Sequence, residues 1–194
     1  GIVSIKVNFT DDAGNYNESL RAFTVDNTPP IINIAHPSEG QKVKSDASGY
    51  IWVNGSITDA NKDNGQNLQI NDSSFTLFSY NSSTGNFSFR NASVIPDGNI
   101  SIKVNFTDDA GNYNESVRTF IVDNTKPAVN ILYPSEGQEV KTGADGYIWI
   151  NGSITDANKL LNQPNINDSR WSLLSYSSST GNFSFRNVSS VSDG

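Results

Sequence analysis

The 194-residue sequence predicts an all-β protein built from tandem β-sandwiches, with about seven strands in each repeat of about 97 residues. Two observations support this fold class. Short runs with alternating apolar residues are separated by turn residues, and no segment has a helical period. In addition, the segment Ser4–Asn15 (SIKVNFTDDAGN) returns letter for letter as Ser101–Asn112. A repeat of this length indicates that the chain is an array of similar domains.

The repeat has a constant spacing over most of its length. Residues 1–62 match residues 98–159 at a spacing of 97, with 47 identical positions. The spacing falls to 96 afterwards, because residues 85–91 match residues 181–187. The missing residue falls in a polar stretch, residues 63–66 of the first copy. Deletions are tolerated in loops, so this stretch is predicted to be a loop between strands.

Each strand of one repeat is predicted from its alternation and from the turns that bound it. In the segment Ser4–Thr10, alternate residues are apolar, and we expect them to face a core: Ile5, Val7 and Phe9. The remaining strands are predicted at residues 30–35, 41–44, 50–57, 75–80, 86–91, 99–107 and 116–123. Turns are predicted between them at residues 37–40, 81–85, 96–98 and 108–112.

Domain boundaries are predicted where a strand is followed by a short connector ending in proline, at residues 25–30 and 122–127. Residues 1–28 are then the last two strands of a preceding repeat. Residues 29–124 form a complete repeat, and residues 125–194 form a repeat lacking its last two strands. We therefore expect the sequence to be a slice of a longer tandem array.

The order of strand, Asp-x-Ala-Gly-Asn loop, strand ending in Val-Asp-Asn-Thr, and proline resembles a known type of module. The matching residues are Asp109–Asn112 with Val122–Thr125 and Pro127, and Asp12–Asn15 with Val25–Pro30. This pattern is similar to the tandem immunoglobulin-like (Ig-like) repeats of prokaryotic (bacterial and archaeal) surface proteins, adhesins and fibres. The resemblance implies Ig-like sandwiches that act as spacers, stalks and fibre-building modules outside the cell.

The overall composition excludes several classes of binding partner and of metal site. The net charge is -7 and the pI is about 4.5, which argues against binding to nucleic acid or to anionic membrane surfaces. There is no cysteine, so neither a disulfide framework nor a thiolate metal site is available. No apolar run approaches the roughly 18 residues of a membrane span, so no membrane insertion is expected in this segment.

Asparagine is abundant and lies unusually often in N-glycosylation sequons. The sequence has 26 Asn and 39 Ser plus Thr, and chance pairing predicts about five Asn-x-Ser/Thr sequons. It contains 14: Asn8, Asn17, Asn54, Asn71, Asn81, Asn86, Asn91, Asn99, Asn105, Asn114, Asn151, Asn167, Asn182 and Asn187. We expect N-linked glycans and an extracellular or cell-surface location. The alternative is that an Asn- and Ser-rich repeat produces sequons incidentally.

Acidic residues gather at the predicted ends of the sandwich. The candidates for one site are Asp26, Asn27, Asp59, Asp108 and Asp109, and those for the next repeat are Asp123, Asn124 and Asp156. Carboxylate and amide oxygens suit Ca²⁺, so calcium at the junctions between modules is a candidate cofactor. The alternative is structural, since Asp and Asn also close turns by bonding backbone N–H groups.

No constellation predicts catalysis. His36 is the only histidine, and its counterpart in the second copy is Tyr133, so no triad recurs with the repeat. The sequence therefore predicts a protein that is not an enzyme. An exposed Trp52 near the sequon at Asn54 predicts either stacking on a sugar or a contact with a partner domain.

These features predict a structural repeat unit of a long, N-glycosylated extracellular fibre or surface stalk. Its partners are neighbouring copies of the same repeat. They form either a covalent array or a donor-strand polymer, in which residues 1–28 of one subunit complete the sandwich begun by residues 125–194 of the next. The alternative is an adhesin or carbohydrate-binding Ig-like module that uses the loop 62–71 or exposed aromatic residues: Tyr50, Trp52, Tyr147 and Trp149.

Overall fold

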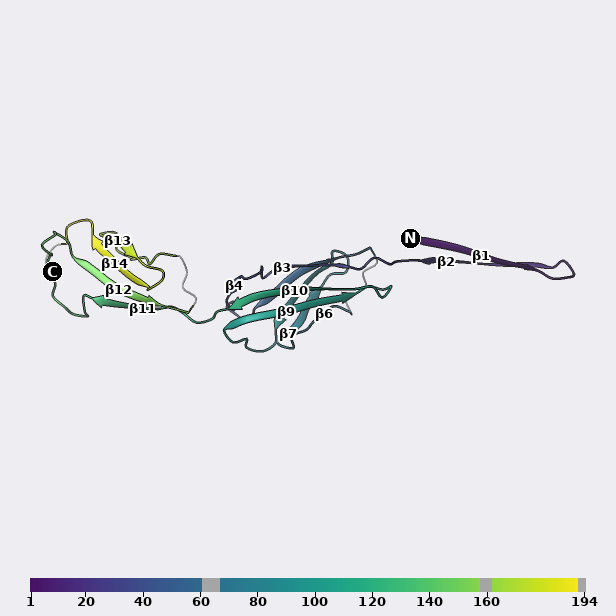
Figure 1. The fold of residues 1–194 in the computed structure, drawn as a ribbon, viewed down its shortest axis with the longest axis horizontal. Coiled ribbons are helices and arrows are strands. Elements are labelled where there is room, and N and C mark those ends of the chain that lie inside the picture. Colours follow the sequence, from purple (N-terminus) through teal and green to yellow (C-terminus); the bar gives the residue numbers. More distant parts are fainter. Residues whose placement is uncertain (61–66, 158–161, 192–194) are drawn as a thin grey trace. The chain divides into compact units, whose positions relative to one another are not determined.

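The computed structural model describes residues 1–60, 67–157 and 162–191, and the regular elements among them are all β-strands (Figure 1). The chain divides into two compact units, Gly1–Asn124 and Thr125–Gly194, which we describe separately. Within the described ranges, there is no helix long and apolar enough to span a membrane.

The first unit contains a complete sandwich of two four-stranded sheets. One sheet has the order β3 (Ile31–His36), β5 (Trp52–Thr58), β8 (Asn86–Asn91), β7 (Phe75–Tyr80). The other has the order β4 (Lys42–Val43), β10 (Tyr113–Val122), β9 (Gly98–Thr107), β6 (Gln69–Ile70). Neighbouring strands are antiparallel except β4, which is parallel to β10. This is the A-B-E-D and G-F-C arrangement of an Ig-like sandwich, so the predicted fold class is confirmed.

The core of this sandwich is formed by alternate residues of both sheets. From β5 and β8 it takes Val53, Ile57, Phe87 and Phe89, all nearly inaccessible to solvent. From β9 and β10 it takes Ile102, Val104, Phe106, Phe120 and Val122, which are fully buried. The period of two in the sequence therefore places one face of each strand inside, as alternation requires.

The predicted strands agree with the observed ones to within a few residues. The largest shift is in β10, which begins at Tyr113 rather than at residue 116. Strand β6 was not predicted, because two residues are too few to display an alternation. It lies at the end of the loop 62–71, and residues 61–66 of that region fall outside the described residues.

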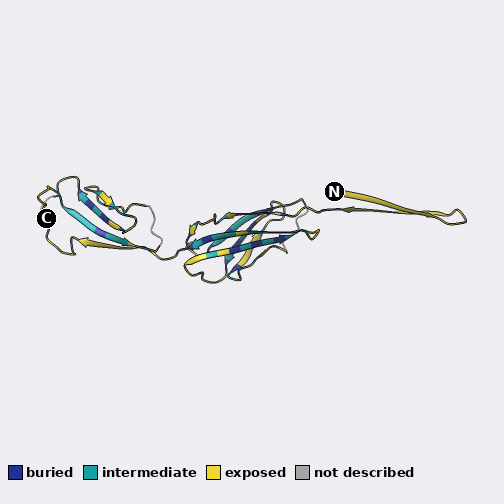
Figure 2. Cartoon of the chain, in the orientation of Figure 1, coloured by how far each residue is buried: buried dark blue, intermediate teal, exposed yellow. Residues whose placement is uncertain are grey.

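The first unit also contains a separate hairpin of β1 (Ile2–Thr10) and β2 (Tyr16–Thr24). The two strands pair with each other over their whole length, and every residue in them is exposed (Figure 2). The expectation that Ile5, Val7 and Phe9 face a core is therefore wrong for this copy: they are 47%, 66% and 73% exposed. The physical reason is that β1 and β2 pair only with each other in the described part of the chain.

The second unit consists of one four-stranded sheet. Its order is β11 (Ala128–Tyr133), β12 (Trp149–Thr155), β14 (Asn182–Asn187), β13 (Trp171–Tyr176), which matches the sheet formed by β3, β5, β8 and β7. No second sheet faces it among the described residues of this unit. Consequently Val129 and Ile131 are exposed, whereas their counterparts Ile32 and Ile34 are buried.

A glycine fixes the same close contact in each of these two sheets. A Cβ atom on Gly55 would lie 2.2 Å from the Asn33 carbonyl oxygen and 2.4 Å from the Phe87 ring. A Cβ atom on Gly152 would lie 2.3 Å from the Phe183 ring. All three distances are too short for a Cβ atom, so a glycine is required where the phenylalanine ring crosses the neighbouring strand.

Candidate functional site

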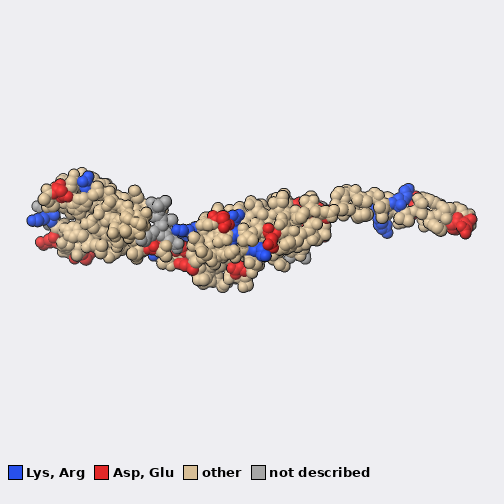
Figure 3. Space-filling model, in the orientation of Figure 1, with Lys and Arg blue, Asp and Glu red and all other residues tan. Residues whose placement is uncertain are grey.

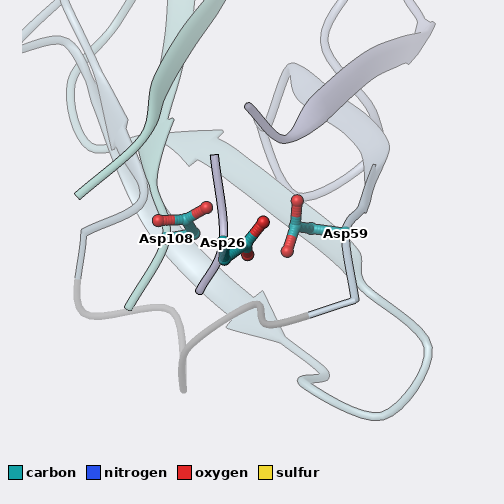
Figure 4. A group of neighbouring side chains, drawn as sticks. All are labelled: Asp26, Asp59 and Asp108. Atoms are coloured by element: carbon teal, nitrogen blue, oxygen red, sulfur yellow. The ribbon is translucent and has the colours of Figure 1, made fainter. Parts of the chain in front are cut away.

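Three carboxylates converge at one end of the complete sandwich (Figure 4). Asp26 lies between β2 and β3, Asp59 follows β5, and Asp108 follows β9. One carboxylate oxygen of each lies within 4.8 Å of the others, although the residues are far apart in sequence. The topology explains the convergence, because the start of β3 pairs with the end of β5 through Ile31 and Thr58. Asp108 is buried, and the other two are half-buried.

Asp108 also organises the β9–β10 turn. Its Oδ1 accepts hydrogen bonds from the backbone N–H groups of Ala110 (2.9 Å) and Asn112 (2.8 Å). Its Oδ2 accepts one from Asn112 Nδ2 (2.9 Å), which also donates to the Asp26 carbonyl oxygen (3.1 Å). Asp108 therefore closes the turn by accepting backbone hydrogen bonds, as the structural alternative predicts. It also belongs to the acidic cluster.

The hairpin shows the same turn without the cluster. Asp11 accepts hydrogen bonds from Ala13 N–H, Asn15 N–H and Asn15 Nδ2 at 3.0, 2.8 and 2.7 Å. The hydrogen bond from the Asn15 side-chain amide is the main reason why the pKa of Asp11 lies below its usual value. The turn is thus a local property of the sequence, whereas the approach of Asp26 and Asp59 to Asp108 is tertiary.

The other predicted metal ligands have different positions. Asn27 and Asp109 are exposed, and Asp109 is not part of the three-carboxylate group found among the described residues. Asn124 closes the end of the sandwich: its Oδ1 accepts a hydrogen bond from Ser45 N–H (2.8 Å). Asp123 and Asp156 belong to different compact units, so the structure does not relate them to each other.

The predicted glycosylation sites fall into three classes of exposure. Eight asparagines are exposed: Asn8, Asn17, Asn71, Asn81, Asn86, Asn99, Asn167 and Asn182. Four are half-buried: Asn54, Asn105, Asn114 and Asn151. Of these, Asn114 uses its Nδ2, the atom that would carry the sugar, to donate to the Pro30 carbonyl oxygen at 2.7 Å.

Two predicted acceptors, Asn91 and Asn187, are buried and require a correction. They are 5% and 8% exposed. Asn91 Oδ1 accepts a hydrogen bond from Ile51 N–H (2.6 Å), and its Nδ2 donates to the Ser93 carbonyl oxygen (2.9 Å). Asn187 makes the equivalent bonds with Ile148 N–H (2.7 Å) and the Ser189 carbonyl oxygen (3.1 Å). A glycan on either nitrogen would break these bonds in a buried place, so we remove both from the candidates.

A signal for this burial is present in the sequence. Asn91 follows Phe87 and Phe89 at intervals of two, so the alternation itself assigns it to the inward face of the strand. The sequon pattern by itself takes no account of this face. Sequon matches on a strand should therefore be filtered by the face on which the asparagine lies.

The tryptophans Trp52 and Trp149 are half-buried and have intramolecular partners, so the expectation of an exposed Trp52 is wrong. The Trp52 indole donates from Nε1 to Asp46 Oδ2 (2.8 Å), and its ring meets the Phe78 ring edge-on at a centroid distance of 5.0 Å. The Arg90 guanidinium lies over the rings of Tyr50 and Phe78, at 4.4 and 4.7 Å from the centroids. These contacts account for an indole on the outer face without a sugar or a partner domain.

The second unit repeats this outer-face cluster with a different aspartate. The Trp149 indole donates from Nε1 to Asp145 Oδ2 (2.9 Å), and Arg186 lies 4.3 Å from the Tyr147 ring centroid. Asp145 does not align with Asp46, because position 46 corresponds to Gly143 at the spacing of 97. Because of this shift, the alignment of the two copies does not pair the aspartates that bind the tryptophans.

Charged side chains of both signs are mixed on the surface. On the face drawn in Figure 3, Lys and Arg lie in small groups among Asp and Glu, and the described residues form no broad basic area there. Cross-strand ion pairs join Lys6 to Glu18 (3.1 Å) and Lys103 to Glu115 (3.2 Å). Both lysines are therefore on the polar face of their strands, as the alternation predicts.

Comparison with solved structures gives weak similarities, of which three are described here. The fibronectin(III)-like modules of Clostridium thermocellum CbhA have 16% identity, with a TM-score of 0.41 over 66% of this chain and 64% of that chain. A three-domain Ig segment of titin has 12% identity, with a TM-score of 0.39 over 96% and 64%. Dimeric latent PorU from Porphyromonas gingivalis has 15% identity, with a TM-score of 0.37 over 71% and 15%.

These scores are below 0.5, so the assignment of the fold depends on the strand order described above. The chain spans 64% of the length of the CbhA and titin chains and 15% of the PorU chain. No protein-family model and no curated protein sequence matches this chain.

Proposed function

We propose that this chain is a structural repeat unit of a long, N-glycosylated extracellular fibre or stalk on a prokaryotic cell surface. The observation that carries the proposal is the repetition of one Ig-like sheet, with the same strand order and the same outer-face contacts, in both units. A receptor-binding domain generally needs one distinctive site, whereas an array needs identical units with satisfied surfaces. In both units the tryptophan Nε1 already donates to an aspartate of the same chain.

Glycosylation at the exposed sequons supports this role physically. Glycans on outward-facing asparagines would cover polar faces and hinder pairing between exposed strand edges of neighbouring copies. The test is glycopeptide mass spectrometry on the chain made in a host that glycosylates Asn-x-Ser/Thr sequons. We expect sugar at exposed sites such as Asn8, Asn86 and Asn182, and none at Asn91 and Asn187, which serve as internal controls. An intact mass of 21.0 kDa, unchanged by glycan removal, would contradict the glycan sheath.

We propose that Asp26, Asp59 and Asp108 hold Ca²⁺. Three carboxylates within 4.8 Å repel one another at neutral pH, and a hard cation among them removes that repulsion. Oxygen-only ligand sets of this kind suit Ca²⁺, and extracellular modules typically bind it with Kd on the order of 10⁻⁴ to 10⁻³ M.

The calcium proposal is tested by thermal unfolding of the complete chain in millimolar CaCl₂ and in EGTA. We expect a higher Tm with calcium, lost in Asp59→Asn and retained in Asp109→Asn. The second variant is the matched control, because Asp109 is exposed and lies outside the cluster. Equal Tm values with calcium and EGTA would overturn the proposal, as would loss of the calcium effect in both variants.

A second candidate function is an adhesin that binds carbohydrate through the outer-face aromatic residues. The observation in its favour is that Phe78, beside Trp52, is more than half exposed. Screening of the chain against an array of glycans discriminates the two. Binding that is lost in Phe78→Ser would favour the adhesin, and absence of binding would favour the structural unit.

A further inference from the structure

The β1–β2 hairpin has an apolar face that nothing covers in the described structure. This face has Ile5, Val7 and Phe9 on β1 and Phe23 on β2, and all four are exposed. A two-stranded hairpin is at best marginally stable in water by itself. An exposed apolar face of this kind marks a surface that binds another protein surface.

The second unit has the complementary deficiency. Its sheet exposes Val129 and Ile131 on β11, at 63% and 58%, on the side where Ile32 and Ile34 of the complete sandwich are buried. The segment that corresponds to β4 lacks its strand partner as well. Val43 pairs in parallel with Val122 and is buried, whereas the equivalent Val140 is half-buried and lies outside any strand.

The complete sandwich shows what covers such a sheet. There, β9 and β10 contact β3, and the segment Ser101–Asn112 that contributes Ile102, Val104 and Phe106 to the core is identical to Ser4–Asn15 of the hairpin. The hairpin β1–β2 therefore has the sequence that fits this kind of sheet. The identical segment therefore specifies which sheet the hairpin fits, beyond general hydrophobicity.

Specific hydrogen bonds between the sheets have counterparts in both uncovered surfaces. Arg118 Nη2 on β10 donates to the Ile34 carbonyl oxygen (2.7 Å), and Asn114 Nδ2 donates to the Pro30 carbonyl oxygen (2.7 Å). The aligned donors on the hairpin are Arg21 and Asn17, and the aligned acceptors in the second unit are the carbonyl oxygens of Ile131 and Pro127.

We propose that the β1–β2 hairpin of one copy of this chain packs on the open face of the β11–β12–β14–β13 sheet of a second copy. The contact completes an Ig-like sandwich from two chains. Each copy of the 194-residue chain then offers one donor hairpin and one acceptor sheet, so association is head-to-tail and can continue to further copies. The proposal requires that Asn17 carries no glycan, because its Nδ2 is the aligned donor in the contact. It is otherwise independent of glycans and of calcium.

The first test measures the molar mass of the unglycosylated chain by light scattering over a range of concentrations. We expect masses that rise from 21.0 kDa to multiples of that value as concentration increases. Val7→Asp should keep the chain at 21.0 kDa, because it places a charge on the docking face. Asn8→Asp is the matched control: it adds the same charge to the opposite face of the same strand and should leave association intact.

A complementation experiment distinguishes this contact from general stickiness. Ile131→Asp disables the acceptor sheet but keeps the donor hairpin, whereas Val7→Asp disables the donor but keeps the acceptor. Each variant alone should be monomeric, and an equimolar mixture should form a complex of two chains that does not grow further. Both substituted side chains are exposed in the single chain, so neither variant disturbs the complete sandwich.

Three results would overturn the proposal. They are a mass that stays at 21.0 kDa at every concentration, association that survives Val7→Asp, and a mixture of the two variants that remains monomeric. Each of these leaves the proposed glycan sheath and calcium site untouched, because those are measured by glycopeptide mass and by Tm.

Discussion

The hairpins β1–β2 and β9–β10 contain nearly the same residues in opposite environments. Both pair in the same antiparallel register, with Thr10 opposite Tyr16 in one and Thr107 opposite Tyr113 in the other. Val104 is fully buried, whereas Val7, with identical neighbours in sequence, is 66% exposed. Strand pairing and turn structure are therefore local consequences of this sequence, and burial is decided by whether a second sheet is present.

The sheets β3–β5–β8–β7 and β11–β12–β14–β13 also have the same strand order but differ in which residues are buried. Phe183 and Phe185 on β14 remain buried, and their rings contact each other, while the Phe183 ring also lies against Gly152 within the sheet. Val129 and Ile131 are exposed, because their counterparts are buried by strands that have no equivalent among the described residues of this unit. The phenylalanines on β14 are thus buried by contacts within their own sheet. Burial of the apolar residues on β11 requires a covering hairpin such as β9–β10.

The largest expected difference separates Phe106→Ala from Phe9→Ala. Phe106 is fully buried, so its truncation should lower the free energy of unfolding of the complete sandwich by about 3–5 kcal/mol. Phe9→Ala should change it by about 0.5 kcal/mol or less at a dilution where the chain is monomeric. Urea denaturation, followed by the NMR signals of the Val53 and Ile57 amides, measures both. Because the flanking residues are identical, equal losses would contradict the contrast between the two hairpins.

A smaller effect tests which bonds need the second sheet. Asn91→Ala and Asn187→Ala each leave a backbone N–H without its acceptor, at Ile51 and Ile148 respectively. Each should destabilise its own unit by about 1–3 kcal/mol. Amide hydrogen exchange at Ile51 and Ile148 is the measurement, and the exposed Asn86→Ala and Asn182→Ala are the controls on the same strands. A loss at Asn91 with none at Asn187 would mean that this bond depends on the opposing sheet.

The smallest effect concerns a local ion pair before β13. Arg170 donates two hydrogen bonds from Nε and one from Nη2 to Asp168 (3.1, 3.1 and 2.6 Å), and this holds the pKa of Asp168 at about 2. The folded pKa is below the unfolded value, so the pair stabilises the fold above about pH 4 and loses its effect as pH falls through about 2.

An NMR titration of the Asp168 carboxylate tests this assignment. The midpoint should rise toward the ordinary aspartate value in Arg170→Ser, which installs the residue found at the equivalent position 74. An unchanged midpoint would show that the ion pair does not form in the second unit. Arg170 is exposed and Asp168 is only half-buried, so solvent screens the pair and the change in overall stability should be small.

Much of the fold was predictable because its signals are local. Alternation located β3, β7, β8 and β9, and the Asp-x-Ala-Gly-Asn loop was correctly read as a turn closed by Asp108. The acidic residues were also identified from sequence, but their grouping was too broad. Exposed Asp109 is next to Asp108 in the chain, yet only the spatial arrangement of Asp26, Asp59 and Asp108 separates them.

By itself, the sequence determined the repeat, the strand register, the turns and the residues able to form a core. These follow from the period of two and from turn chemistry, which act over a few residues. Only the tertiary structure decided that Val104 is buried while Val7 is exposed, that Asn91 and Asn187 serve the backbone, and that three aspartates meet. Those outcomes depend on which sheet lies opposite a strand, and identical stretches of sequence cannot encode that difference.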